Sequence, residues 1–178
     1  KTRLSKRHGA TSVIAYKEMG FLPEALVNYL VRLGWAHGDQ EIFSQKDLIE
    51  LFDLDAVGKS PAVFNPEKLL WLNAYYIKEA SPERLREEMK PLWSDGINTD
   101  DADFTRKVIT DLQPRVKTLA ELASMADFYF TDEIKYEEQA AKKFLTSDVS
   151  HYLKALAEKI SPVQNFSKEG LEEFLKNF

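Results

Sequence analysis

The sequence predicts a mainly α-helical protein, and three observations support this prediction. Helix-start signals recur along the whole chain, the connections between them are short, and no alternating strand pattern of any length appears. Apolar residues make up 44% and charged residues 30% of the 178 residues, a balance typical of a globular chain. This length suffices for one large domain or two small ones.

The first two helices are expected to form a tight pair. Thr11 or Ser12 can cap the first helix, and Gly20 can end it in the left-handed conformation. A second helix is expected over residues 23–34, because a proline followed by an acid is a favourable helix start. Its predicted buried stripe has i, i+3 and i+4 spacing and consists of Leu22, Leu26, Tyr29, Leu30 and Leu33.

A capping box marks the next helix. Residues 35–43 indicate a turn and a short extended segment, with His37 as a turn residue. Ser44 then has the spacing to Asp47 that a capping box requires, which predicts a helix through Phe52.

Two helix starts then follow in close succession. Residues 65–67 (Asn-Pro-Glu) place a cap, a proline and an acid in order, and predict a helix through about Lys78. Residues 81–83 (Ser-Pro-Glu) repeat this chemistry at once. Because stacked starts indicate a change of helix direction, we predict two domains, residues 1–80 and 81–178.

The second domain is expected to contain further helices with short connections. They are predicted near residues 82–90, 101–112, 117–128, 135–145, 148–160 and 168–177. Ser167 is expected to cap the last helix. The aromatic run at residues 128–130 (Phe-Tyr-Phe) is expected in the core rather than as a platform for stacking bases.

Composition excludes several kinds of site. The chain has no cysteine and three scattered histidines, so we expect neither disulfides nor a metal site. No apolar stretch approaches the roughly 20 residues that span a bilayer, and the basic amino terminus is not followed by an apolar signal core. We therefore expect a cytoplasmic protein without membrane contact.

Charge is distributed unevenly. The net charge is -5, but residues 1–40 hold six basic and three acidic residues, a local +3 that leaves -8 for the remainder. Four of the first seven residues are basic and can meet phosphate, whereas the acidic remainder needs local attraction to contact nucleic acid. On charge alone, a basic tail without a function is an open alternative.

Residues 3–7 (Arg-Leu-Ser-Lys-Arg) resemble the KMSKS signature of class I aminoacyl-tRNA synthetases, in the variant typical of bacterial glutamyl enzymes. Further segments follow in the order of that family, namely residues 20–26, 33–35, 38–44, 60–64, 66–73 and 113–115. The chain therefore resembles the carboxy-terminal portion of a bacterial-type glutamyl-tRNA synthetase. No HIGH-like motif accompanies the signature, so we do not expect this portion to catalyse alone.

The resemblance implies that the signature residues act on ATP, which is the substrate of the full-length enzyme together with Mg²⁺. Lys6 is assigned as the catalytic residue, and Arg3, Ser5 and Arg7 join it in binding ATP. Cations near the leaving phosphates stabilise the charge that develops when the α-phosphate is attacked. For Ser5, an ordinary solvated serine is the alternative.

The resemblance also implies contacts with tRNA(Glu). It places a stem-contact module after the signature, followed by an α-helical anticodon-binding domain that is incomplete at the carboxy end. Lys68 and Lys78 are assigned to the tRNA stem, with a solvated surface lysine as the alternative for Lys68. Trp71, on the same expected helix, is predicted to lie in the core because leucines surround it.

Arg115 is assigned to the third anticodon base, where glutamate anticodons carry cytosine and glutamine anticodons carry guanine. A guanidinium offers only donors, so it suits the acceptor edge of cytosine and opposes the donor edge of guanine. Pro114 is expected to break the preceding helix and turn Arg115 outward. The alternative is a surface arginine paired with Asp111 or Glu121.

These observations lead to one leading hypothesis. The chain is the tRNA-binding portion of a monomeric, cytoplasmic glutamate–tRNA ligase, which activates glutamate with ATP and transfers it to tRNA(Glu). A non-catalytic helical interaction module is the alternative. The glutaminyl enzyme shares a similar signature but continues into β-barrels, against which the helical pattern argues. Whether the parent enzyme discriminates between glutamate and glutamine tRNAs stays open.

Overall fold

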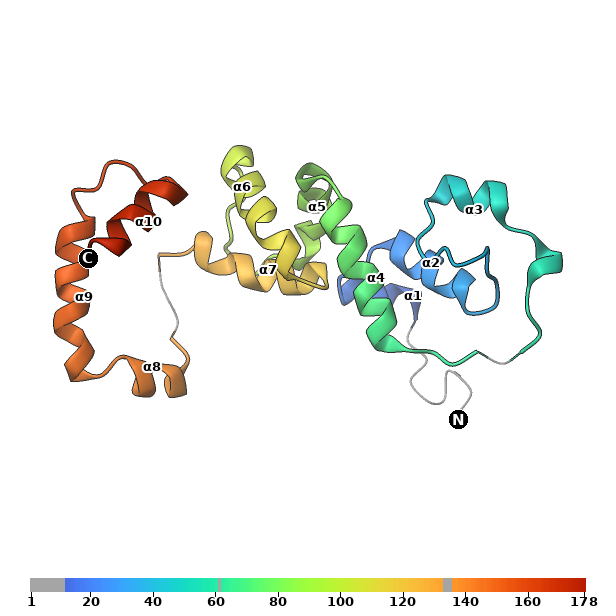
Figure 1. The fold of residues 1–178 in the computed structure, drawn as a ribbon, viewed down its shortest axis with the longest axis horizontal. Coiled ribbons are helices and arrows are strands. Elements are labelled where there is room, and N and C mark those ends of the chain that lie inside the picture. Colours follow the sequence, from blue (N-terminus) through green and yellow to red (C-terminus); the bar gives the residue numbers. More distant parts are fainter. Residues whose placement is uncertain (1–11, 61, 133–135) are drawn as a thin grey trace. The chain divides into compact units, whose positions relative to one another are not determined.

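The computed structural model describes residues 12–60, 62–132 and 136–178, and these residues are mainly helical (Figure 1). Within these ranges the structure contains no strand, and extended backbone pairs only in an isolated bridge between His37 and Gln40. The predicted mainly α class is therefore confirmed. The chain divides into two compact units, with the division directly after Asp132.

The helices of both units are labelled in Figure 1. The first unit contains α1 (Val13–Glu18), α2 (Pro23–Arg32), α3 (Gln45–Leu51), α4 (Pro66–Glu79), α5 (Pro82–Met89), α6 (Ala102–Leu112) and α7 (Leu119–Ala126). The second contains α8 (Glu138–Phe144), α9 (Ser147–Ile160) and α10 (Lys168–Lys176). Short 3-10 turns extend or connect several of them, namely Leu54–Ala56, Lys90–Leu92, Gln113–Arg115 and Asp127–Tyr129.

The predicted capping residues start their helices. Five of these side chains accept a hydrogen bond from a first-turn amide: Ser12, Ser44, Asn65, Ser81 and Ser167. Ser44 and Asp47 form the complete capping box, with N–O distances of 3.0 and 2.9 Å. Gly20 has a φ of +82°, the left-handed end that was predicted. Caps of this kind stabilise a helix by about 1 kcal/mol each.

Some helix ends differ from the prediction. The second helix ends at Arg32 instead of residue 34. The helix predicted over residues 117–128 begins only at Leu119, because the hydroxyl of Thr118 accepts from the amide of Glu121 and caps it there. It then tightens into a 3-10 turn over Asp127–Tyr129. The predicted start of the next helix at residue 135 lies outside the described residues.

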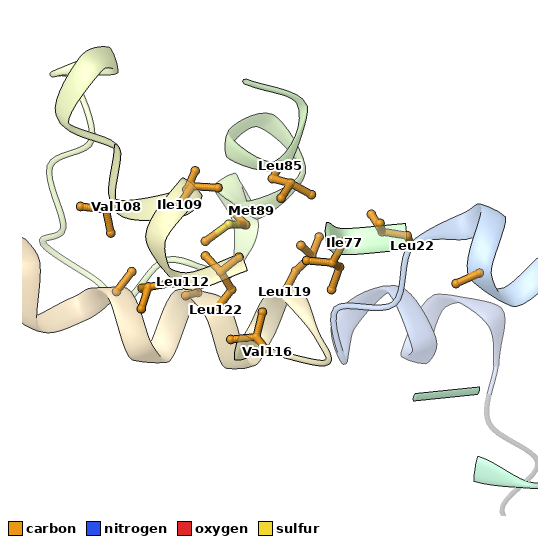
Figure 2. Close-up of a cluster of buried hydrophobic side chains, with 13 residues drawn as sticks. Leu22, Ile77, Leu85, Met89, Val108, Ile109, Leu112, Val116, Leu119 and Leu122 are labelled. Atoms are coloured by element: carbon orange, nitrogen blue, oxygen red, sulfur yellow. The ribbon is translucent and has the colours of Figure 1, made fainter. Parts of the chain in front are cut away.

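The main hydrophobic core of the first unit lies among α4, α5, α6 and α7 (Figure 2). It consists of Leu22, Ala25, Ile77, Leu85, Met89, Val108, Ile109, Leu112, Val116, Leu119, Leu122, Ala123 and Ala126. A second, smaller cluster joins α2 to α4 and consists of Leu26, Tyr29, Leu69 and Leu72. A third consists of Trp35, Phe43 and Leu48.

Residues before and after position 80, where we predicted a domain boundary, contact each other. Leu22 and Ala25 belong to the same core as the residues of α5, α6 and α7. The guanidinium of Arg84 on α5 also donates two hydrogen bonds to the carboxylate of Glu24 on α2, at 2.6 and 2.9 Å. Residues of the two predicted domains therefore belong to one hydrophobic core, and the boundary between the domains stays a prediction.

Three apolar residues that we predicted to be buried are exposed. Leu30 is 49% exposed. The segment over residues 41–43 packs on the side of α2 that carries Asn28, and Leu30 points away from that side. Trp71 is 47% exposed, because α4 buries the side that carries Leu69 and Leu72, and Trp71 points away from it. Phe128 is 58% exposed, since consecutive residues of a 3-10 turn point in directions about 120° apart. Its two aromatic neighbours do pack partly against the main core.

The second unit is packed less tightly than the first. None of the described side chains in α8, α9 and α10 is fully buried. Phe144, Tyr152 and Phe166 are each about 60% exposed.

Candidate functional site

Helix α4 carries the predicted stem-contact lysines on its exposed side. Lys68, Trp71, Tyr75 and Lys78 follow each other at i, i+3, i+7 and i+10. At 3.6 residues per turn, these four positions fall within an arc of about 80° and extend over roughly 15 Å. Trp71 and Tyr75 are 47% and 36% exposed, and Lys78 is exposed as well. We call these four residues the α4 face.

Lys68, at one end of the α4 face, is held by an acidic partner. Its Nζ lies 2.6 Å from Oε1 of Glu41, and Nη2 of Arg32 lies 3.7 Å from the same oxygen. The hydrogen bond from Lys68, followed by its charge, holds the pKa of Glu41 below its usual value. Two cations thus share one carboxylate, so these three side chains together carry one net positive charge.

Lys78, at the other end of the α4 face, lies beside the segment that carries Arg115. The backbone carbonyl of Lys78 accepts a hydrogen bond from Nε2 of Gln113 at 3.0 Å. The structure therefore places the turn that contains Arg115 against the carboxy end of α4, although Gln113 and Lys78 are 35 residues apart in the sequence. Lys68 lies ten residues earlier on α4, roughly 15 Å away along the helix axis.

Arg115 ends the 3-10 turn Gln113–Arg115, which follows α6. Pro114 lies in this turn, Arg115 is exposed, and the next residue, Val116, is buried in the main core. In the described part of the chain, Arg115 forms no ion pair with Asp111 or Glu121. The guanidinium is therefore not engaged by either of the two carboxylates considered as the alternative.

The four signature residues predicted to bind ATP lie outside the described residues, namely Arg3, Ser5, Lys6 and Arg7. The first described helix, α1, begins at Val13 and follows them closely along the chain.

Over the ranges that the structure describes, no three His, Cys, Asp or Glu side chains are arranged so as to hold a metal ion. In the same ranges, no helix is long and apolar enough to pass through a membrane.

The sequence did not predict the exposure of the two aromatic residues of the α4 face. Trp71, on the helix that the resemblance places near the tRNA stem, was predicted to lie in the core because leucines lie beside it, and Tyr75 was not among the candidate residues. A helical projection of residues 66–79 carries the signal, because Lys68, Trp71, Tyr75 and Lys78 share one side while Leu69, Leu72 and Ile77 point elsewhere.

Comparison with known proteins defines the family. Residues 84–178 match the model described as the anticodon binding domain, and residues 1–71 match that of the catalytic domain of class I tRNA synthetases (E and Q). Among curated relatives, glutamate–tRNA ligase 1 of Syntrophus aciditrophicus is 57% identical over 99% of this chain, and glutamate–tRNA ligase of Geobacter sulfurreducens is 56% identical over all of it. The chain belongs to the glutamate–tRNA ligase family.

The ligase family also accounts for the fold. A crystal structure of a glutamate tRNA ligase from Elizabethkingia meningosepticum, in complex with its amino acid, superimposes with a TM-score of 0.82 at 28% identity. The match covers 99% of this chain and 39% of that one. The chain spans about 38% of the length of the two curated ligases named above. It corresponds to the end of the catalytic domain together with the anticodon-binding domain of the ligase, as predicted.

Proposed function

We propose that this chain is the tRNA-binding portion of a glutamate–tRNA ligase that activates glutamate with ATP and transfers it to tRNA(Glu). One observation carries the proposal: the exposed Arg115 is attached, through Gln113, to the same helix whose exposed side presents Lys68 and Lys78. A lysine-bearing face and an exposed arginine on one rigid support form a surface suited to a polyanion with a base to be identified.

The α4 face is the proposed stem contact. Lys68 and Lys78 donate to backbone phosphates at its two ends, and the exposed rings of Trp71 and Tyr75 offer apolar surface to a ribose or base between them. Because the chain as a whole carries a charge of -5, attraction for tRNA is confined to such local groups of cations.

Arg115 is the proposed reader of the third anticodon base. Its guanidinium donates to the O2 and N3 acceptors of an unpaired cytosine. Guanine presents N1–H and N2–H donors at that edge, so donors would face donors. Buried donors without partners cost about 1–3 kcal/mol, which corresponds to roughly tenfold to hundredfold discrimination.

The remaining assignments follow from the family. Lys6, with Arg3, Ser5 and Arg7, contacts the phosphates of ATP in the complete enzyme, where ATP is accompanied by Mg²⁺. Residues 1–80 form the signature loop and stem-contact module, and residues 81–178 form the anticodon-binding domain. We further propose that the complete ligase is monomeric and cytoplasmic.

The test is the substitution Arg115→Gln in a complete ligase that contains this chain. Glutamylation is measured with two tRNAs that differ only by cytosine or guanine at the third anticodon position. An amide both donates and accepts, so the preference for cytosine should narrow by about tenfold. Arg106→Gln, which changes an exposed arginine of α6 paired with Asp103, is the matched control and should leave the preference as it is. An unchanged preference after Arg115→Gln would refute the proposed role of Arg115.

A further inference from the structure

Two buried carboxamides hold the segment that carries Arg115, one on each side of it. We call residues 113–117 the Arg115 turn. On the amino-terminal side, Gln113 is only 8% exposed, and its Nε2 donates to the carbonyls of Lys78 at 3.0 Å and Ala80 at 3.4 Å. These carbonyls lie at the carboxy end of α4, where a helix leaves its last carbonyls without intrahelical partners.

On the carboxy-terminal side, Asn73 of α4 performs the same task. It is fully buried, and its Nδ2 donates to the carbonyl of Lys117 at 2.7 Å. The same group also donates to the carbonyl of Gly20 at 3.2 Å, and Oδ1 accepts from the amide of Leu22 at 2.8 Å. One side chain thus joins α4 to the turn between α1 and α2 and to the Arg115 turn.

The contact between these turns leaves no free space. The amide of Leu119 donates to the carbonyl of Gly20 at 2.9 Å. A Cβ added to Gly20 would lie 2.4 Å from the backbone nitrogen of Ala120. The Arg115 turn is therefore fixed to α4 directly by Asn73 and Gln113, and is further immobilised by the backbone that follows it.

The burial of Gln113 is costly for stability. Its Oε1 is buried and has no hydrogen-bond partner among the described residues. A buried acceptor without a partner costs about 1–3 kcal/mol. An apolar side chain at this position would avoid that cost, but it would not attach the Arg115 turn to α4. Attachment of the Arg115 turn to α4 therefore explains the presence of an amide at position 113 better than packing does.

We propose that Asn73 and Gln113 are positioning residues for anticodon reading, an inference that rests on the proposed role of Arg115. Discrimination against guanine requires that the guanidinium be unable to retreat from a mismatched edge. If the Arg115 turn could move by about 1 Å, the opposed donors would separate and most of the penalty for guanine would vanish. Asn73 and Gln113 prevent this movement, so specificity depends on them although neither contacts the base.

A buried asparagine elsewhere in the first unit provides the matched control. Asn28 is also fully buried. Its Nδ2 donates to the carbonyl of Glu41 at 3.0 Å, and its Oδ1 accepts from the amide of Phe43 at 2.8 Å and from the hydroxyl of Tyr76 at 2.7 Å. Asn28→Ala therefore removes as many hydrogen bonds as Asn73→Ala, but it does not touch the Arg115 turn.

The experiment compares four variants of a complete ligase that contains this chain: Asn73→Ala, Gln113→Leu, Asn28→Ala and Arg115→Gln. For each, the ratio of kcat/KM for the cytosine and guanine tRNAs is measured. We expect Arg115→Gln to narrow the ratio about tenfold. Asn73→Ala and Gln113→Leu should each narrow it at least about threefold, with Arg115 intact. Asn28→Ala should preserve the ratio while lowering the melting temperature as much as Asn73→Ala does.

Non-additivity separates positioning from a general loss of stability. Once Arg115 is replaced, nothing remains to be positioned, so the double variant Asn73→Ala/Arg115→Gln should have the same ratio as Arg115→Gln alone. If Asn73→Ala does not fold, Gln113→Leu alone tests the inference. This substitution preserves side-chain volume and removes only the hydrogen bonds of Gln113 to the end of α4.

Each contrary result has a distinct meaning. If Arg115→Gln narrows the ratio while both positioning variants preserve it, the inference is wrong and the proposed function stands. If Asn28→Ala narrows the ratio as much as Asn73→Ala, the effect follows stability and the inference is also wrong. If Arg115→Gln itself has no effect, the proposed reading role fails, and the inference fails with it.

Discussion

Replacement of Gly20 by alanine tests the packing on which the site depends. Gly20 has a φ of +82°, a conformation that costs an L-residue with a Cβ roughly 1–2 kcal/mol. The new Cβ would also lie 2.4 Å from the nitrogen of Ala120 and 2.7 Å from that of Leu119, where ordinary contact begins at 3.4 Å. The turn and the start of α7 must therefore separate by about 1 Å.

That separation breaks hydrogen bonds as well. The carbonyl of Gly20 accepts from the amide of Leu119 at 2.9 Å and from Nδ2 of Asn73 at 3.2 Å. A shift of about 1 Å takes the first beyond hydrogen-bond distance, and a buried polar group left unpaired costs about 1–3 kcal/mol. With the conformational term, Gly20→Ala should lower the free energy of unfolding by roughly 2–5 kcal/mol.

Gly96 supplies the matched control. Its φ of +86° is nearly the same, but a Cβ there would meet no atom within 4 Å. Gly96→Ala should therefore cost only the conformational term, roughly 1–2 kcal/mol. Both variants are compared with the unsubstituted chain in urea unfolding curves, which are monitored by circular dichroism at the helical band. Equal losses within about 0.5 kcal/mol would show that the contact of Gly20 with α7 does not constrain the fold.

Further predictions concern charge and pH. Burial raises the pKa of Glu24, but the hydrogen bonds and charge of Arg84 outweigh it and place the pKa below its ordinary 4.5; the stabilisation is thus full at neutral pH and is lost as the pH falls below that value. In Glu24→Gln this part of the acid sensitivity of the unfolding midpoint should be absent, and identical acid profiles would contradict the prediction. Burial raises the pKa of Tyr76 to about 12, so its contribution to stability is present below pH 10 and is lost as the pH rises from there towards 12. Tyr76→Phe should cost about 1–2 kcal/mol near neutral pH and should abolish the last tyrosine transition in an absorbance titration, whereas an unaltered titration would argue against the assignment. Binding of tRNA to this chain should be weak, and its affinity should fall with added salt. Lys68→Ala and Lys78→Ala should each make the slope of log affinity against log salt concentration shallower by about 0.9. Unchanged slopes would show that these lysines do not contact tRNA phosphates.

Local chemistry made much of the fold predictable from the sequence. A cap is formed by residues within one turn of each other, so Ser44 with Asp47 and Asn65 with Pro66 specify helix starts without reference to the rest of the chain. The family likewise follows from ordered sequence segments. Through it the sequence nominated Lys68, Lys78 and Arg115, whose roles stay proposals.

Tertiary structure alone decided which side of each helix is covered and which distant segments meet. Trp71 and Leu30 lie on sides that the described residues leave about half exposed. Periodicity cannot supply that information, because it gives the spacing of residues but not the position of neighbours. Asn73 reaches Lys117 through a hydrogen bond that spans more than forty residues. A buried carboxamide must find partners wherever the fold brings carbonyls and amides within about 3 Å, so its role becomes visible only once the chain is folded.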